Sequence, residues 1–268
     1  ARWAHNPEVI GSNPVPATMN VTTIVDPSSG VLVSTIVEKA LASIAHSWQQ
    51  QKSAHIVLTG GRTGIQIART LDTQLFRLLN SEAFSQNGSL EGNPLVLHVW
   101  FSDERFTDLS DPDRTDTNLV AQFEKCSHLK IFEINFHRVS SPTELSLQDA
   151  ADEYAAQLDK TLGEHNFDAV ILSMGEDGHV ASLFPGLVTT AHHTKSAVAV
   201  DTSPKPPAQR VSISVDRLSQ SSAIYIFVLG ETKREALTKF IARDEGPVAL
   251  LKEAGKFGQI IIATDLKI

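Results

Sequence analysis

Short apolar runs alternate with longer segments of helical period from Val21 to the end of the chain. The first run, Val21–Val25, is predicted to be a strand, and Val31–Gln50 follows with apolar side chains at the spacing of one helix face. This alternation is typical of a layered α/β sheet and disfavours separate all-strand and all-helix domains. Because no linker clearly divides the chain, we predict a single domain.

The same pattern predicts elements along the rest of the chain. Predicted strands are His55–Thr59, Leu95–Phe101, Ile131–Val139, Asp168–Ser173, Val198–Val200, Val211–Val215, Ala223–Leu229 and Gln259–Thr264. Predicted helices are Gly64–Asn80, Asn118–His128 with Thr115 or Asp116 as its cap, Glu144–His165, Gly230–Ala242 and Pro247–Glu253. Predicted loops are Ser81–Pro94 and Asp108–Asp116.

The first eighteen residues do not share this pattern. Arg2 to Thr18 shows neither a helical nor a strand period, and Gly11-Ser12-Asn13-Pro14 is what the T-arm of a tRNA gene would encode. We therefore expect residues 1–18 to be a non-native or disordered leader with Met19 as the true start. Residues 19–268 are then expected to form the α/β domain.

Composition and charge narrow the classes of function. The hydrophobic content of 41% is ample for a packed core. A formal net charge of −8 argues against affinity for nucleic acid or anionic lipid, so an anionic substrate would need a locally cationic pocket. No apolar run is long enough for a membrane span and no secretion signal is recognisable, so we expect a cytoplasmic protein. The single cysteine, Cys126, is expected to be a free thiol in a helix.

The run Met174-Gly175-Glu176-Asp177-Gly178-His179 is the strongest chemical signal in the chain. It follows Ala169-Val170-Ile171-Leu172, whose unbroken apolar character is typical of a buried parallel strand. Open α/β sheets bind ligands at the carboxyl ends of their strands. We therefore interpret Asp177 and His179 as an acid–base pair at the edge of such a crevice.

A second signal is the loop Thr59-Gly60-Gly61-Arg62-Thr63-Gly64, between a predicted strand and a predicted helix. Backbone N–H groups at a helix start can bind an anion, adjacent glycines allow close approach, and Thr63 adds a hydroxyl. The loop matches neither the nucleotide P-loop nor the dinucleotide fingerprint. Taken alone, it is equally compatible with a structural turn.

Charged residues follow other predicted strands. Asp103-Glu104-Arg105 would project from the same rim as the glycine loop, although in isolation a surface salt-bridge cluster is the simpler interpretation. Lys205 and Arg210 lie in a proline-rich loop that could bind phosphate or serve as a rigid basic connector. Five further side chains, all histidines, are not expected to be catalytic or metal-binding. His192 and His193 are expected to be solvent-exposed, and His55, His98 and His137 to be packed or solvated.

Taken together, these segments resemble the 6-phosphogluconolactonase family, which is grouped with the glucosamine-6-phosphate isomerases. The resemblance extends from about Val21 to the C-terminus. It rests on the following segments in order: Gly60 to Thr63, Asp103-Glu104-Arg105, Asp116-Thr117-Asn118, Gly175-Glu176-Asp177-Gly178-His179 to Pro185, Lys205 to Arg210, and Gly230-x-x-Lys233. It implies a Rossmann-like α/β fold: an open, mostly parallel sheet with helices on both faces, in one domain.

The resemblance also implies an activity, namely hydrolysis of 6-phosphogluconolactone to 6-phosphogluconate in the oxidative pentose phosphate pathway. His179 would be the general base and Asp177 would support it. The residues implied to hold the phosphate or nearby sugar oxygens are Gly60, Gly61, Arg62, Thr63, Asp103, Arg105, Asn118, Gly178, Lys205 and Arg210. A phosphosugar lactone is the expected partner, with no metal, no organic cofactor and no obligate protein partner.

The chain departs from the family in its glycine loop. The family commonly has Gly-Gly-Ser-Thr-Pro, whereas here Arg62 replaces the serine and Gly64 the proline. Loss of the proline removes some preorganisation at the predicted first helical turn. Arg62 could contact the phosphate or face solvent.

Two alternatives remain open at the level of sequence. A glucosamine-6-phosphate isomerase or deaminase would share the Asp-Gly-His loop, but there the loop typically continues Ile-Ala-Phe-Asn-Glu-Pro. Here Val180-Ala181-Ser182-Leu183-Phe184-Pro185 lacks that glutamate. A non-catalytic sugar-phosphate sensor could use the same pocket, although the retention of Asp177 and His179 weighs against it.

Overall fold

The computed structural model describes residues 21–81, 94–126, 129, 131–243, 246–254 and 258–267. The expected leader, most of the expected loop Ser81–Pro94, and the expected helix end at His128 lie outside the described residues.

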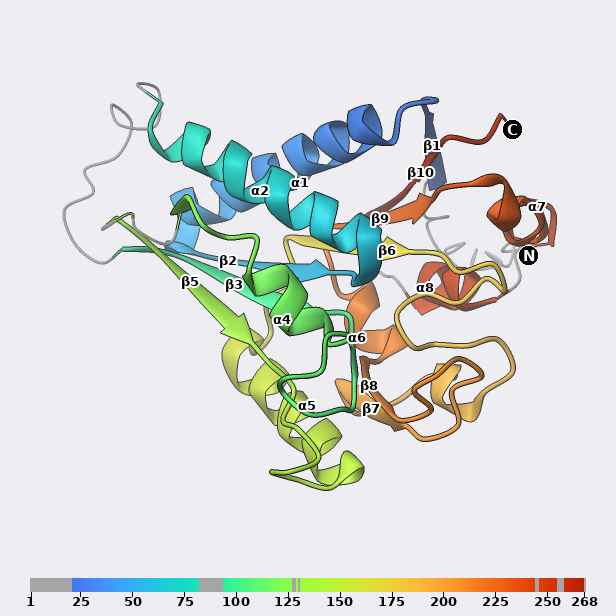
Figure 1. Ribbon diagram of the computed structural model, residues 1–268. Helices are drawn as coiled ribbons and strands as arrows, with labels where there is room; N and C mark the ends of the chain where they lie inside the picture. The colour runs from blue at the N-terminus through green and yellow to red at the C-terminus, as the bar shows by residue number, and fades with distance from the viewer. Residues whose placement is uncertain are drawn as a thin grey trace, which may run out of the picture.

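A seven-stranded sheet forms the centre of the molecule, and all its neighbouring strands are parallel (Figure 1). In spatial order the strands are β1 (Val21–Val25), β10 (Gln259–Thr264), β9 (Ala223–Val228), β6 (Ala169–Ser173), β2 (Ser53–Leu58), β3 (Leu95–Phe101) and β5 (Phe132–His137). The predicted strands at these places are confirmed, with ends that shift by up to two residues.

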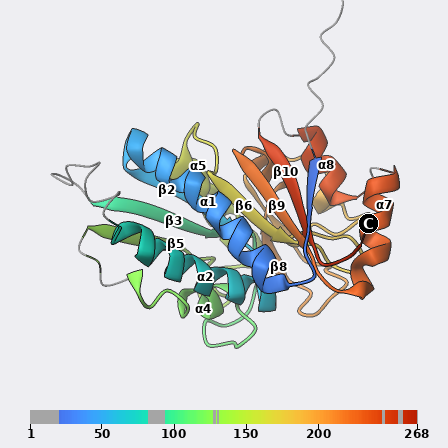
Figure 2. The ribbon, with the colours of Figure 1, turned by 90° about the horizontal axis from the view of Figure 1, so that it is seen from above.

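Helices cover both faces of this sheet, which confirms the expected α/β class (Figures 1 and 2). On one face lie α1 (Ser29–Gln51), α2 (Gly61–Leu79) and α4 (Thr115–Val120). On the other lie α5 (Leu147–Leu162), α6 (Val215–Ser219), α7 (Arg234–Arg243) and α8 (Pro247–Ala254). Two short 3-10 helices are η2 (Val188–Thr190) and η3 (Glu231–Lys233).

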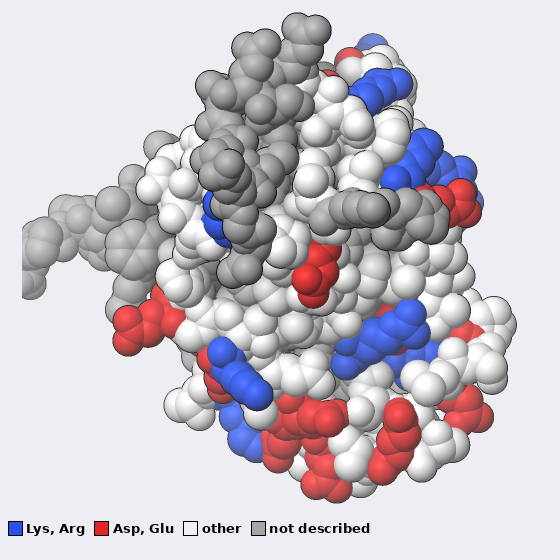
Figure 3. All heavy atoms as spheres, turned by 90° about the vertical axis from the view of Figure 1, so that its left-hand side faces the viewer, with Lys and Arg blue, Asp and Glu red and all other residues white. Residues whose placement is uncertain are grey.

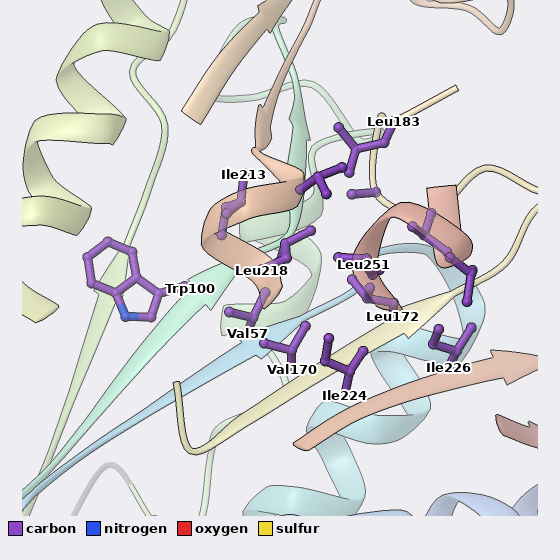
Figure 4. Close-up of a cluster of buried hydrophobic side chains, with 14 of the residues drawn as sticks. Val57, Trp100, Val170, Leu172, Leu183, Ile213, Leu218, Ile224, Ile226 and Leu251 are labelled. Atoms are coloured by element: carbon purple, nitrogen blue, oxygen red, sulfur yellow. The ribbon is translucent and has the colours of Figure 1, made fainter. Parts of the chain in front are cut away.

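Each face of the sheet has its own hydrophobic core, because successive side chains of a strand point to opposite faces. In β2, Val57 belongs to one core, and Ile56 and Leu58 belong to the other. Figure 4 shows the first core, where the strand residues face Leu218 of α6, Leu251 of α8 and Ile213 at the end of β8 (Arg210–Ile213). The labelled strand side chains there are Val57, Trp100, Val170, Leu172, Ile224 and Ile226. Truncation of one such side chain to alanine typically costs about 2–5 kcal/mol, so each of them contributes substantially to the stability of the sheet.

A second, three-stranded antiparallel sheet was not predicted. It consists of β4 (Asp103–Arg105), β8 (Arg210–Ile213) and β7 (Ala197–Val200), in the order β4-β8-β7. The prediction that Asp103-Glu104-Arg105 projects from the same rim as the glycine loop is confirmed for Asp103 and Arg105, which line one cavity with Gly60 and Gly61, but Glu104 is buried. The pairing of these residues with β8 was not predicted. The predicted strand Val211–Val215 ends two residues early, since the Ser214 side chain accepts the Arg217 N–H at 3.3 Å and caps α6.

The helix predicted at Asn118–His128 starts earlier and is shorter, as α4. Its predicted cap is also wrong, because Arg114 occupies the cap position and gives no side-chain cap. Cys126 is buried beyond the end of α4 as a free thiol, beside Asp72. Burial, reinforced by Asp72, raises the pKa of Cys126 to about 12, so the thiol is unreactive near neutral pH.

Three histidines predicted to be packed or solvated form a stack with Trp100 on the sheet. The ring of His98 lies between His55, at 4.5 Å between centroids, and His137, at 5.1 Å. Trp100 stacks on His137 at 3.6 Å and its indole N–H donates to Nδ1 of His55 at 3.3 Å. The prediction is confirmed: these side chains are part of the packing.

The surface charge is unevenly distributed. Figure 3 shows that, on the described part of one face, acidic side chains gather along the lower edge while basic ones lie in separate groups. Among the helices of the described ranges, none has both the length and the apolar character that a membrane crossing requires.

Candidate active site

A cavity lies at the carboxyl ends of four neighbouring strands, β9, β6, β2 and β3. From β2 the chain continues outward to β3 and β5, and from β6 it continues the other way to β9 and β10. The boundary between β2 and β6 is therefore a topological switch point, where open α/β sheets bind ligands. The residues that line the cavity are Thr59, Gly60, Gly61, Asp103, Arg105, Thr115, Ser173, Met174, Gly175, His179, Ala181, Arg210 and Lys233.

His179 reaches the cavity from a tight turn after β6. The Gly175 N–H donates to the carbonyl of His179 at 2.8 Å, and the Gly178 N–H donates to the carbonyl of Gly175 at 3.0 Å. Within this turn, His179 Nδ1 lies 2.5 Å from Oδ1 of Asp177. A Cβ atom at Gly175 would lie 2.1 Å from the imidazole and 2.7 Å from the carboxylate, so glycine is required there.

The surroundings of the imidazole favour its neutral form. Burial, and then the charge of Lys205, lower the pKa of His179, and the hydrogen bond to Asp177 only partly offsets them. Lys205 Nζ lies 3.4 Å from Asp177 Oδ1 and 3.5 Å from His179 Nδ1. Although burial opposes it, the bond from His179 and the charge of Lys205 lower the pKa of Asp177. A carboxylate at Nδ1 places the imidazole proton there and leaves Nε2 able to accept a proton.

The glycine loop forms the uncapped start of α2, which begins three residues earlier than predicted. Gly60 is the cap residue, gives no side-chain cap, and is followed by Gly61 with a φ of +69°. The N–H groups of a first helical turn lack partners within the helix and attract anions. A Cβ at Gly60 would lie 2.6 Å from the Thr115 hydroxyl. At Gly64, which replaces the family's proline, a Cβ would lie 1.9 Å from the Thr59 carbonyl.

Strand β4 places alternate side chains in the cavity wall. Asp103 and Arg105 line the cavity, whereas Glu104 is fully buried. Asp103 accepts a hydrogen bond from the Ser182 hydroxyl at 2.6 Å and lies 3.7 Å from Nη1 of Arg210. The β4–β8 register sets Arg105 opposite Arg210, so two guanidinium groups meet the same cavity.

Arg210 also holds the loop that carries Lys205. Its Nη2 donates to the carbonyls of Lys205 and Pro206, each at 3.1 Å, and its Nε donates to the carbonyl of Pro207 at 3.1 Å. The side chain is nearly buried and its Cζ lies 5.8 Å from the Phe184 ring centroid. Phe184 in turn contacts the His179 ring, with centroids 4.5 Å apart. Arg210 therefore supplies a positive charge to the cavity and also fixes the loop that carries Lys205.

Lys233 was missed as a site residue, although Gly230-x-x-Lys233 was part of the family resemblance. It follows β9 in η3, lines the cavity, and its Nζ donates to the Ser173 hydroxyl at 3.3 Å. Burial lowers the pKa of Lys233, and the nearby cations Lys205 and Arg62 act in the same direction. Thr115 and Ser173 were missed as well, since neither carries a signal before the strand order is known.

Several predicted catalytic or binding residues do not line the cavity. Asp177 and Lys205 stand behind His179, as described above, and Gly178 shapes its turn with a φ of +85°. Arg62 is exposed and Thr63 is half-buried beside the loop. The Asn118 amide donates to the carbonyls of Pro112 and Arg114, both at 2.7 Å, and thus closes the loop before α4.

The histidine pair after η2 lies elsewhere. His192 Nδ1 is 2.8 Å from Asp216 Oδ1 and about half of its side chain is exposed. His193 is half-buried and its backbone N–H donates to Asp216 at 2.6 Å, so the prediction of solvent exposure is wrong for His193. Within the residues that the structure describes, no group of three or more His, Cys, Asp or Glu side chains could hold a metal ion.

Comparison with solved structures agrees with this architecture. A 6-phosphogluconolactonase from Trypanosoma cruzi superposes with a TM-score of 0.74 at 22% identity, over 92% of this chain and 95% of that one. One from Thermotoga maritima gives a TM-score of 0.68 at 23% identity, over 91% and 98%. These likenesses establish the shared fold.

Curated sequences are similar over most of the chain. The 6-phosphogluconolactonase of Mycobacterium tuberculosis is 28% identical over 223 residues, which is 80% of this chain and 83% of that protein. The human GDH/6PGL endoplasmic bifunctional protein is 28% identical over 214 residues, but the match spans only 24% of its length. The protein-family model for "Glucosamine-6-phosphate isomerases/6-phosphogluconolactonase" matches residues 27–261. The chain therefore belongs to the family of glucosamine-6-phosphate isomerases and 6-phosphogluconolactonases.

Proposed function

We propose that this protein hydrolyses 6-phospho-D-glucono-1,5-lactone to 6-phospho-D-gluconate, in the oxidative pentose phosphate pathway. The supporting observation is that one cavity is lined by a histidine whose pKa burial lowers, by cations and by an uncapped helix start. Such a cavity suits a substrate with an electrophilic carbonyl at one end and a phosphate at the other. The protein is thus a hydrolase that acts on a cyclic carboxylic ester.

His179 would act as the general base. Its Nε2 takes a proton from a water molecule as the water oxygen attacks the lactone carbonyl, and the tetrahedral intermediate then breaks the bond to the ring oxygen. The same proton passes from His179 to that oxygen, and the new carboxylic acid ionises into solvent. A positioned base contributes about 10²–10⁴-fold, which is ample for an ester that is already activated by its ring. Asp177 stabilises the imidazolium that forms transiently.

The phosphate would be held at the opposite wall of the cavity. Gly60 and Gly61 present backbone at the start of α2, where the helix dipole and free N–H groups favour an anion. Arg105, Arg210 and Lys233 supply positive charge in the same cavity. Asp103, which also lines the cavity, is partnered by Ser182 and Arg210 and would accept hydrogen bonds from sugar hydroxyls.

An isomerase or deaminase activity on glucosamine-6-phosphate is the competing function within the family. That chemistry uses a glutamate shortly after the histidine, directly before a proline, and the corresponding position here is Phe184, before Pro185. Phe184 is buried and its ring centroid lies 4.5 Å from that of His179, so an apolar side chain without a basic group stands where that glutamate would be. This arrangement supports the lactonase assignment.

A coupled assay with freshly generated lactone tests the proposal. Spontaneous ring opening is measured without protein and subtracted, and we expect a remaining acceleration that His179→Ala removes while substrate binding is retained. Acceleration that persists in the variant would refute the role of His179. Ammonia release from glucosamine-6-phosphate would favour the deaminase, and lactone binding without acceleration would favour a sensor.

A further inference from the structure

Glu104 lies behind the cavity wall and accepts hydrogen bonds from the backbone of β4 and of the start of α4. Its side chain is fully buried, and its carboxylate accepts the N–H of Thr115 at 2.7 Å and the N–H of Asp116 at 2.8 Å. These are the first two residues of α4, so a residue of β4 caps this helix in place of a local side chain. The carboxylate also accepts the N–H of Arg105 at 2.7 Å.

A buried arginine completes the arrangement. Arg114 Nε lies 3.9 Å from Glu104, and the guanidinium makes two hydrogen bonds to Asp116, at 3.1 and 2.9 Å. It also donates to the carbonyls of Thr107 and Val139, at 2.9 and 2.6 Å. The cation is thus surrounded by acceptors and fixes the segment that leads into α4. Glu104, Arg114 and Asp116 are not among the residues that line the cavity.

The groups that Glu104 fixes do line the cavity. Arg105 is the next residue of β4, and Thr115 is the first residue of α4. The Thr115 hydroxyl would lie 2.6 Å from a Cβ at Gly60, so Thr115 is also the surface against which the glycine loop packs. One carboxylate therefore sets the relative positions of a guanidinium, a hydroxyl and the start of α2.

We propose that Glu104 is a positioning residue, which fixes Arg105 and Thr115 against the glycine loop and thereby determines how tightly the phosphate of the substrate is held. This inference rests on the proposed function. Glutamine has the same shape but only one acceptor oxygen, so its NH₂ group would face a backbone N–H. Aspartate keeps the carboxyl group but is too short to reach the start of α4.

The effect should appear in substrate binding rather than in the chemical step. We expect Glu104→Gln and Glu104→Asp each to raise KM at least about tenfold, as is usual for the loss of a hydrogen bond to a charged group, while kcat changes about threefold or less. Binding of inorganic phosphate, measured by calorimetry, should weaken in parallel. The phosphate measurement does not depend on turnover.

Asp72→Asn is a matched control. Asp72 is also buried, and its carboxylate also accepts two backbone N–H groups, from Lys125 and Cys126 at 3.1 and 3.0 Å. It lies eleven residues along α2 from Gly61, or about 16 Å from the cavity. We expect this variant to lose stability but to keep its KM and its phosphate affinity.

The outcomes are distinguishable. A wild-type protein without lactonase acceleration would refute the proposed function, whereas an active wild type whose Glu104 variants keep their KM and phosphate affinity would refute the positioning role. A large fall in kcat at unchanged KM would also refute it. If one variant does not fold, the other decides. Failure of both to fold would overturn the proposal, because Glu104 would then serve the stability of the fold.

Discussion

Nδ1 of His179 and Oδ1 of Asp177 are 2.5 Å apart, although the two residues are separated by a single glycine. Such closeness within a tight turn holds the imidazole in place relative to its own loop. The pair is thus built into the local sequence. Only the direction in which Nε2 points depends on the rest of the fold.

The first prediction concerns this pair. We expect His179→Ala to lower kcat by about 10²–10⁴-fold, the usual contribution of a general base, with little change in substrate affinity. Asp177→Asn should lower kcat by less, because the base remains but its imidazolium form loses a charged partner. Steady-state kinetics with the spontaneous rate subtracted provide the measurement. An Asp177→Asn loss larger than that of His179→Ala would contradict these roles.

The second prediction concerns Lys205 and pH. A base must be neutral, so kcat/KM should rise with pH through the pKa of His179, which burial and Lys205 hold below its usual 6.5. Lys205→Met removes a positive charge near the imidazole and should move this acidic limb to higher pH. Lys195→Met is the control, because Lys195 pairs with Asp152 and does not line the cavity. If the acidic limb of the kcat/KM profile does not move in Lys205→Met, the effect of Lys205 on the pKa of His179 is refuted.

The third prediction separates two contributions of Arg210. Arg210→Ala should chiefly raise KM, because it removes a cavity cation. Arg210→Lys keeps the charge, yet a single ammonium group cannot reproduce the bonds from Nη2 and Nε to three carbonyls. We therefore expect Arg210→Lys to raise KM as well. Because the lost bonds hold the loop that carries Lys205, this variant should also move the acidic limb of the pH profile of kcat/KM, as Lys205→Met does. A lysine variant with wild-type kinetics would show that charge alone matters.

The fourth prediction concerns stability in acid. Burial lowers the pKa of His55 to about 3 and that of His137 to about 4, from 6.5. Below pH 6.5 the unfolded chain therefore binds more protons at these two histidines than the folded chain does, so their contribution to the free energy of unfolding falls as pH falls. Urea titrations at pH 7.5 and 5.0 measure this loss. His137→Phe keeps an aromatic ring on Trp100 but cannot be protonated, so its loss should be smaller than that of the wild type.

Much of the main sheet was predictable because its strands are unbroken apolar runs. The apolar runs of β6 and β9 are predictable as buried strands because an exposed run of this kind would be unfavourable, and the helices between the strands have one apolar face. The glycine loop and His179 were predictable because chemistry follows such strands. By contrast, β4 consists of Asp103, Glu104 and Arg105, which have none of the composition of a strand. Only its pairing with β8 makes it one.

Neither the place of Lys233 in the cavity nor the bonds of Arg210 to the loop 205–207 could be predicted, for a related reason. Lys233 enters the cavity because β9 lies beside β6, a neighbour relation that no local pattern encodes. Arg210 bonds to backbone carbonyls, which every residue possesses, so no residue type signals the contact. Asn118 illustrates the converse, since its place in the family resemblance gave no hint that its amide closes a loop.

The edge position of β1 has a consequence for how the protein is made. Its neighbour in the sheet is β10, which lies between β1 and β9. As the chain leaves the ribosome, Val21–Val25 therefore emerges early but finds no strand to join until Gln259–Thr264 has been synthesised. The nascent chain can assemble β2, β3 and β6 in the meantime, while the first strand waits unpaired and exposed to chaperones or to self-association.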